Sequence, residues 1–127
     1  MNSNLKHEDL SRQIIGAAME VLNELRPGQD ERIYERALEV ELGLRGLKVE
    51  RQKQFQVTYK GVPIGTFIPD FIVEDLIIVD PKVVTEFNDA HIAQMLGYLA
   101  ITRLSLALLF NFKHAKLEWR RVVPPSV

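Results

Sequence analysis

The chain has 127 residues and a formal net charge of −1, with 46% hydrophobic and 26% charged residues. This length fits a single domain, residues 1–127 with a core at about 9–123, and the composition excludes a disordered or fibrous protein. The absence of cysteine excludes disulfides and thiolate zinc sites, and the charge gives no global sign of a nucleic-acid binder.

Two amphipathic helices are predicted in the first third of the chain. Apolar residues recur with helical spacing from Glu8 to Leu25, and Arg26-Pro27-Gly28 then breaks the pattern. A second helix is predicted from the N-cap Asp30 to Leu44, with Gly46 as its terminator. The residues expected on the core side of this helix are Ile33, Ala37, Val40 and Leu44.

Strands are predicted in the middle of the chain. After Leu47 the apolar residues alternate up to the turn signal Lys60-Gly61, and a returning strand runs from Val62 to Ile68. The pattern continues at Phe71 to Val73, and a tight turn at Glu74-Asp75 precedes the run from Leu76 to Val79. We expect three or four antiparallel strands in this region.

A third helix is predicted from the cap Asn88 to about Arg103, followed by two further strands. The continuous apolar run from Leu106 to Phe110 suits a strand that is buried on both faces. The last strand, from Leu117 to Val123, is expected at an edge, and Pro124-Pro125 ends it. The predicted order is α-α-β-β-β-α-β-β, which indicates an α/β fold of the α+β type.

Two acids and a lysine stand at the ends of apolar, strand-like runs. Asp70 follows Ile68-Pro69, while Asp80 follows Ile77 to Val79 and precedes Lys82 by two residues. Because side chains alternate along a strand, Asp80 and Lys82 project from the same face. Burying an acid and an amine is costly unless they pair with each other or with a metal, so these residues are candidates for a functional centre.

These residue types fit metal-dependent hydrolysis of a phosphodiester. Mg²⁺ prefers oxygen ligands and is often held by one or two carboxylates, which Asp70 and Asp80 supply. The carbonyl of Pro81 would add a third ligand, and Lys82 would orient the attacking water or stabilise the phosphorane. The alternative from spacing alone is that Asp70 begins a turn while Asp80 and Lys82 form a solvated pair.

The Pro69-Asp70 and Asp80-Pro81-Lys82 motifs resemble those of the PD-(D/E)XK nuclease superfamily, whose sites are named for this arrangement. Within it, the segment Gly28-Gln29-Asp30-Glu31-Arg32-Ile33-Tyr34 resembles the Gly-x-x-Glu-x-x-Tyr signature of the small GxxExxY proteins. The resemblance covers nearly the whole chain, roughly Asp9 to Val123. It implies a PD-(D/E)XK restriction-endonuclease-like core, in which helices flank a mixed β-sheet.

The resemblance also implies a nuclease that hydrolyses nucleic acid with Mg²⁺ or Mn²⁺. In it Asp70 and Asp80 match the metal-binding acids, and Lys82 matches the catalytic lysine. Glu31 matches an accessory acid of some members, although an acid in the first turn of a helix is also favoured by the helix dipole. Gln94 and Tyr98 resemble a Gln-x-x-x-Tyr element on the DNA side of the site. Their helix neighbour His91 is interpreted as a surface histidine.

The chain departs from the family pattern at the acid-x-lysine motif. The family generally has Glu-x-Lys with an aliphatic middle residue, whereas this chain has Asp80-Pro81-Lys82. The alternative function is therefore a catalytically degenerate nuclease-fold protein that acts as a nucleic-acid or protein-binding module.

The expected partner is nucleic acid, DNA more than RNA, with a homodimer or a partner protein as a further possibility. Basic residues cluster in the middle of the chain and near its end, and either cluster would suit phosphates or form a solvated face. The chain begins without the apolar stretch of a signal peptide and has no run long enough to span a bilayer, so no membrane partner and a cytoplasmic location are expected.

Overall fold

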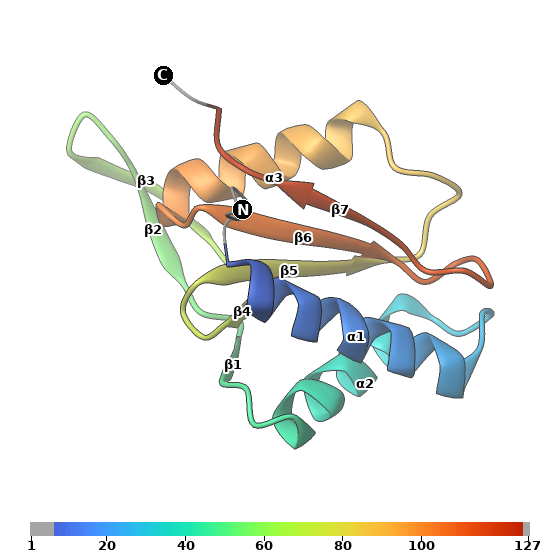
Figure 1. Cartoon of the computed structure of the whole chain (residues 1–127). Helices are drawn as coiled ribbons and strands as arrows, with labels where there is room; N and C mark the ends of the chain where they lie inside the picture. Colours follow the sequence, from blue (N-terminus) through green and yellow to red (C-terminus); the bar gives the residue numbers. More distant parts are fainter. Residues whose placement is uncertain (1–6, 126–127) are drawn as a thin grey trace, which may run out of the picture.

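The computed structural model describes residues 7–125, which form three helices and seven strands (Figure 1). The helices are α1 (Glu8–Leu25), α2 (Glu31–Leu44) and α3 (Asp89–Thr102). The strands are β1 (Val49–Arg51), β2 (Phe55–Tyr59), β3 (Val62–Phe67), β4 (Phe71–Val73), β5 (Ile77–Lys82), β6 (Leu106–Asn111) and β7 (Glu118–Val122). Residues 1–6, where the sequence predicts no signal peptide, and residues 126–127 lie outside the described range.

Five of the strands form a mixed sheet in the order β1-β4-β5-β6-β7. Neighbours pair antiparallel except β5 and β6, which are parallel and connected through α3. Helices α1 and α2 cover one face of this sheet and α3 covers the other (Figure 1). The predicted fold class, an α+β fold with a mixed sheet between helices, is confirmed. Within residues 7–125 no helix is long and apolar enough to cross a bilayer.

Alternation along β5 and β6 sends side chains into two separate cores. The α1/α2 face buries Val79 and Leu108, while the α3 face buries Ile78 and Leu109. Every residue of β6 is buried, which confirms the prediction of a strand that is covered on both sides. The edge position predicted for the last strand is also confirmed, since β7 pairs only with β6.

Two of the predicted strands are each divided in two, so the observed order is α-α-β-β-β-β-β-α-β-β. Gln52 adopts a left-handed conformation with φ of 59° and separates β1 from β2. The segment Ile68-Pro69-Asp70 separates β3 from β4, because Pro69 has no N–H to continue a ladder. Strands β2 and β3 consequently form a separate two-stranded sheet, joined by the predicted turn at Lys60-Gly61.

The prediction for the buried face of α2 was wrong. Tyr34, Leu38 and Leu42 are fully buried, whereas Val40 is 62% exposed. The predicted residues Ile33 and Leu44 are exposed as well, and Ala37 is half-buried. Two apolar stripes lie side by side on this helix at similar spacing, so the period alone does not select one. The stacking of the Tyr34 ring on Phe112, with centroids 4.8 Å apart, fits the observed rotation.

This rotation predicts opposite outcomes for two substitutions on α2. Leu38→Ala should lower the free energy of unfolding by about 2 to 5 kcal/mol, because it opens a cavity in the core. Val40→Ala should change it by less than about 0.5 kcal/mol, because the side chain is exposed. Urea unfolding of both variants beside the wild type measures the difference, and a larger loss for Val40→Ala would contradict the observed face.

Candidate active site

The two candidate acids meet where the ladder between β4 and β5 ends. The last pair in this ladder is Phe71 with Val79, so the next positions in register are Asp70 and Asp80. Opposite residues of an antiparallel pair project from the same face of the sheet. Both carboxyls therefore point to the α3 side, in the same alternation as the buried Ile72 and Ile78.

A pair of prolines explains why the ladder stops at this point. The carbonyl of Lys82 accepts the Phe112 N–H at 2.9 Å on the β6 side, so the backbone of Pro81 faces β4. Pro69 lies two residues before Phe71. If the register continued, Pro69 would therefore be the partner of Pro81. Neither proline has an N–H, so no ladder hydrogen bond can form between them. The carbonyl of Pro81 is thus left on the side where the strands part.

A cavity of about 140 Å³ lies at this end of β5. It collects side chains from α2, from the segment that precedes β4, from β5 and from α3. The six side chains predicted from the sequence all line it: Glu31, Asp70, Asp80, Lys82, Gln94 and Tyr98. Ile68, Pro69 and Ile78 complete the lining, and Pro81 is not part of it. The structure therefore brings the predicted side chains together, while a ligand role for the Pro81 carbonyl stays a prediction.

A chain of polar contacts runs through the cavity. The Lys82 ammonium lies 3.4 Å from the Asp80 carboxylate and donates to Gln94 Oε1 at 3.3 Å. Gln94 Nε2 in turn donates to the Tyr98 hydroxyl at 2.6 Å, one turn further along α3. These contacts fix one end of the lysine between an acid and an amide. The cavity thus holds a positive charge beside the two aspartates.

The two aspartates retain a proton more strongly than ordinary carboxyls. Burial and the neighbouring Asp80 raise the pKa of Asp70 to about 7, and the two groups share a hydrogen bond. Burial also raises the pKa of Asp80, with Lys82 opposing the shift. Two acids that repel each other in a buried site are relieved by a proton or by a cation. The oxygen-only donor set suits a hard divalent ion that keeps several waters.

The third acid at the cavity is Glu31, at the start of α2. Glu31 is exposed to solvent as a whole, but its carboxyl points to the cavity and accepts the Val83 N–H at 3.2 Å. Partial burial of the carboxyl raises the pKa of Glu31, and the hydrogen bond from Val83 opposes this. Within residues 7–125, no group of three or more histidine or acidic side chains lies close enough together to hold a metal ion.

The Gly-x-x-Glu-x-x-Tyr motif forms a loop that positions Glu31. The Tyr34 hydroxyl donates to the Arg26 carbonyl at 2.5 Å and accepts the Gln29 N–H at 3.1 Å. Gly28, between those two residues, has φ of 113°, a conformation that other residues rarely adopt. The buried tyrosine therefore ties the loop to the helix that follows it, and the helix presents Glu31 to the cavity.

Asn111, which holds the chain beyond Lys82, was not predicted as a site residue from the sequence. This side chain is fully buried; its amide donates to the Val84 carbonyl at 2.8 Å and its oxygen accepts the Val84 N–H at 3.1 Å. Its amide also donates to the Glu118 carboxylate at 2.9 Å. A polar residue at the end of the apolar run of β6 was the available signal, because a buried amide needs partners.

The interpretation of His91 as a surface residue is consistent with its place in the cap of α3. Its Nδ1 accepts the Asn88 N–H at 3.1 Å, and the Asn88 side chain accepts the His91 N–H at 3.0 Å. Both hydrogen bonds belong to a capping box. His91 is not among the residues that line the cavity.

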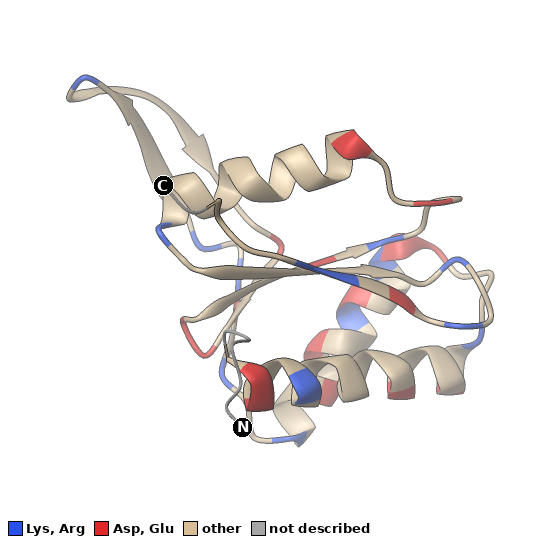
Figure 2. Ribbon diagram, turned by 45° about the horizontal axis from the view of Figure 1, so that its top comes forward, with Lys and Arg blue, Asp and Glu red and all other residues tan. Residues whose placement is uncertain are grey.

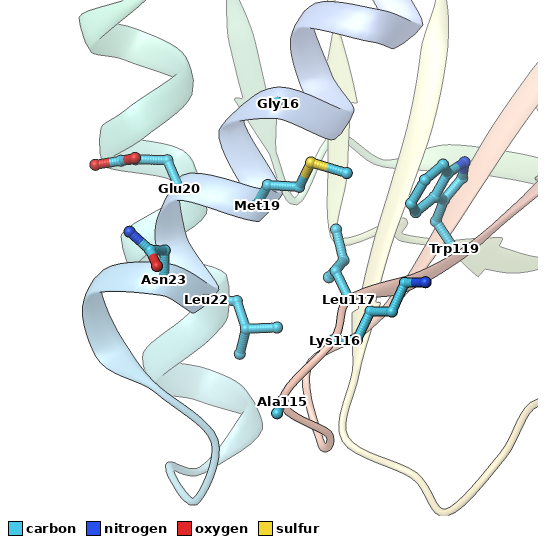
Figure 3. A pocket seen from close by; sticks show the side chains of 9 residues that line it. All are labelled: Gly16, Met19, Glu20, Leu22, Asn23, Ala115, Lys116, Leu117 and Trp119. Carbon is cyan, nitrogen blue, oxygen red and sulfur yellow. The ribbon is translucent and has the colours of Figure 1, made fainter.

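A larger hollow lies elsewhere on the molecule, between α1 and the chain that leads into β7 (Figure 3). It measures about 500 Å³ and is lined mainly by apolar side chains, among them Met19, Leu22, Leu117 and Trp119. It contains one acid, Glu20, and one lysine, Lys116, and no carboxyl pair. Its chemistry is that of an apolar groove, so the smaller acidic cavity is the candidate active site.

Comparison with known proteins identifies a family. A family model described as the PD-(D/E)XK nuclease superfamily matches residues 8–122. The matched segment includes every helix and strand of the described part of the chain, and all six side chains that were predicted and line the cavity. No curated protein and no solved structure matches the chain.

Removing the hydroxyl that ties the loop to α2 should destabilise the protein. Tyr34→Phe leaves the Arg26 carbonyl and the Gln29 N–H without this partner, so the free energy of unfolding should fall by about 1 kcal/mol. Tyr59→Phe is the matched control, because that side chain is exposed on the hairpin. Urea unfolding compares the two, and equal stabilities would show that the tie contributes nothing.

The raised pKa of Asp70 predicts a pH-dependent gain from Asp70→Asn in metal-free protein. The pKa of Asp70 is about 7 in the folded state and lower in the unfolded state. The contribution of Asp70 to the free energy of unfolding therefore falls as pH rises from about 4 to about 7. The substitution removes that penalty, so its gain in melting temperature should be larger at about pH 8 than at about pH 5. Thermal unfolding in EDTA measures this, and a gain independent of pH would refute the coupling.

Proposed function

The chain belongs to the PD-(D/E)XK nuclease superfamily, and from that membership and its acidic cavity we propose that it is a divalent-metal-dependent nuclease. The reaction is hydrolysis of phosphodiester bonds in nucleic acid. The observation that carries the proposal is the convergence of the predicted side chains from four separate segments in one cavity. Two repelling carboxyls placed face to face lower the stability of the fold, so a purely structural role would not explain their position.

The proposed metal ligands are the carboxylates of Asp70 and Asp80, with the Pro81 carbonyl as a further donor. Members of the superfamily typically use divalent metal ions, and Mg²⁺ or Mn²⁺ is the ion we propose here. The ion, when bound, lowers the pKa of a water ligand and takes up negative charge on the phosphate. The raised pKa values of both acids support this assignment, because a cation would replace the proton they share.

Lys82 is the proposed catalytic lysine. Contacts with Asp80 and Gln94 hold its ammonium at the cavity, where a fixed positive charge stabilises the phosphorane and orients the attacking water. Gln94 and Tyr98 position this lysine from α3, and Glu31 supplies an accessory carboxylate from α2. Asn111 supports the arrangement by fixing the backbone beyond Lys82.

We also propose that the chain is a GxxExxY protein within the superfamily. The motif supports this, because Gly28, Glu31 and Tyr34 act together as one loop and helix start beside the cavity. DNA is the proposed substrate in preference to RNA, and the cytoplasm is the proposed location.

A catalytically degenerate binding module is the second candidate, and one observation favours it. Lys82 already makes contacts with Asp80 and Gln94, so the polar network is satisfied without a substrate. In that case the cluster would only hold β5 against α3. The two candidates differ in whether metal supports cleavage, which an activity assay decides.

Incubation of the protein with single-stranded and double-stranded DNA, and with RNA, should show cleavage with Mg²⁺ or Mn²⁺ and none in EDTA. Lys82→Ala should lower the rate by about 100-fold or more while calorimetric Mn²⁺ binding persists, because the lysine is not a ligand. Lys48→Ala is the matched control, since Lys48 pairs with Asp75 and lies outside the cavity.

Absence of cleavage with either ion on all three substrates would contradict the nuclease assignment. Nucleic-acid binding without cleavage would then favour the degenerate module. Loss of activity in Lys48→Ala equal to that in Lys82→Ala would show that general charge, rather than the position of the lysine, is responsible.

A further inference from the structure

The hairpin formed by β2 and β3 stands apart from the five-stranded sheet (Figure 1). Its root is attached to α3 through aromatic rings: Phe67 lies 3.8 Å from Tyr98 between ring centroids, and Phe55 lies 6.4 Å from Phe67. Tyr98 also lines the acidic cavity. The inner face of the hairpin root is therefore packed beside the candidate active site.

Toward its tip the hairpin exposes large apolar side chains, some of them on the face whose root packs against α3. Val62 and Ile64 on β3 are 59% and 64% exposed, and Tyr59, directly opposite Val62, is 61% exposed. Alternation along β2 puts Tyr59 and its partner Val62 on the same face as Phe55 and Phe67, whose rings lead to Tyr98 at the cavity. Ile68, just after β3, is also exposed and lines the cavity. Soluble proteins rarely keep contiguous apolar rows uncovered unless they bind something. The exposed side chains of Tyr59, Val62, Ile64 and Ile68 are here called the apolar strip, and they lie between the hairpin tip and the cavity.

The charge of the hairpin selects the kind of partner. Residues 52–69 contain two lysines and no acid, although the chain as a whole has a net charge of −1. Figure 2 shows the absence of acidic residues from the hairpin and a basic residue at its tip. There the Lys60 ammonium lies 5.4 Å from the centre of the Tyr59 ring, while Lys53 at the base lies 3.7 Å from Glu50. A partner with negative charge and apolar surfaces complements this composition.

We infer that the apolar strip binds the unpaired bases of a nucleic-acid strand whose backbone continues into the cavity. The inference rests on the proposed nuclease function. Unpaired bases expose apolar faces that stack on aromatic and aliphatic side chains, while lysines contact the phosphates. The outside of a duplex presents phosphates and would require more cations than the two that the hairpin carries. The substrate class is therefore a single strand or a frayed end rather than an intact duplex.

The dimensions agree with a short single-stranded footprint. At a rise of about 3.3 Å per residue, the path from Val62 to Ile68 covers roughly 20 Å. This length accommodates a few nucleotides before the strand reaches Asp70, two residues beyond Ile68. Because Ile68 lines the cavity and the hairpin root packs on Tyr98, which also lines it, a bound strand would be delivered to the carboxyl pair.

Fluorescence anisotropy in EDTA tests the inference without cleavage. The probes are a dye-labelled single-stranded oligothymidine and a blunt-ended duplex of equal length. Wild-type protein should bind the single strand at least about tenfold more tightly than the duplex, and Ile64→Ser and Val62→Ser should each weaken single-strand binding by about five- to tenfold. The matched control is Val40→Ser on α2, equally exposed and remote from the strip, which should stay within about twofold of wild type. Thermal unfolding verifies that each variant remains folded.

Several outcomes would overturn the inference. Equal affinity for single strand and duplex would do so, as would unchanged single-strand affinity in both strip variants. If size-exclusion chromatography showed a dimer that Ile64→Ser dissociates without loss of nucleic-acid binding, a second copy of the chain would be the occupant of the strip. Binding that depends on the strip, in a protein that cleaves nothing, would support this inference while refuting the nuclease function, so the two failures are distinguishable.

Discussion

The end of the ladder between β4 and β5 is the constraint on which the candidate site depends. Beyond Phe71 and Val79 the register would bring two prolines opposite each other, and prolines donate no hydrogen bond. The strands part there, and Asp70 and Asp80 face each other at the opening. A regular ladder would instead have carried both strands onward and left no cavity for the carboxyls. The remaining elements supply groups to this opening: Lys82 from β5, an amide and a hydroxyl from α3, and a carboxylate from α2.

Much of the fold could be predicted from local chemistry. The Asn88 cap, the tight turns and the doubly apolar strand β6 each depend on a few neighbouring residues, and the structure has them where the sequence indicates. Asp30 also stands at the N-cap position of α2, although its side chain makes no capping hydrogen bond. The face of α2 that is buried could not be predicted from the sequence. Its two apolar stripes have the same period, and they differ only in the residues of other elements that they contact. Tertiary contacts distinguish them, among them the stacking of Tyr34 on Phe112. The division of the strands at Gln52 similarly depends on a backbone conformation that the sequence does not mark.

The candidate site was predictable to a different degree. Asp80 and Lys82 share a face through simple alternation, and Gln94 and Tyr98 share one through helical spacing, so their grouping is a local property. Their meeting with Glu31 across the sheet edge is not local, and the sequence supported it only through the family resemblance. Asn111 was missed for the same reason, since Val84, whose backbone it holds, lies 27 positions away along the chain. Each motif could be predicted because its residues are close together in the sequence. The contacts between motifs could not, because they join residues that are far apart in the sequence.

In the proposed nuclease, the carboxyls of Asp70 and Asp80 together hold a divalent ion. Calorimetric titration of Mn²⁺ into wild-type protein and into Asp80→Asn tests it most directly, with the exposed Asp89→Asn as the matched control. We expect Mn²⁺ to bind to the wild type and to the control, with release of protons near neutral pH, and binding to be lost in Asp80→Asn. Absence of binding to the wild type, or equal binding to Asp80→Asn, would contradict it.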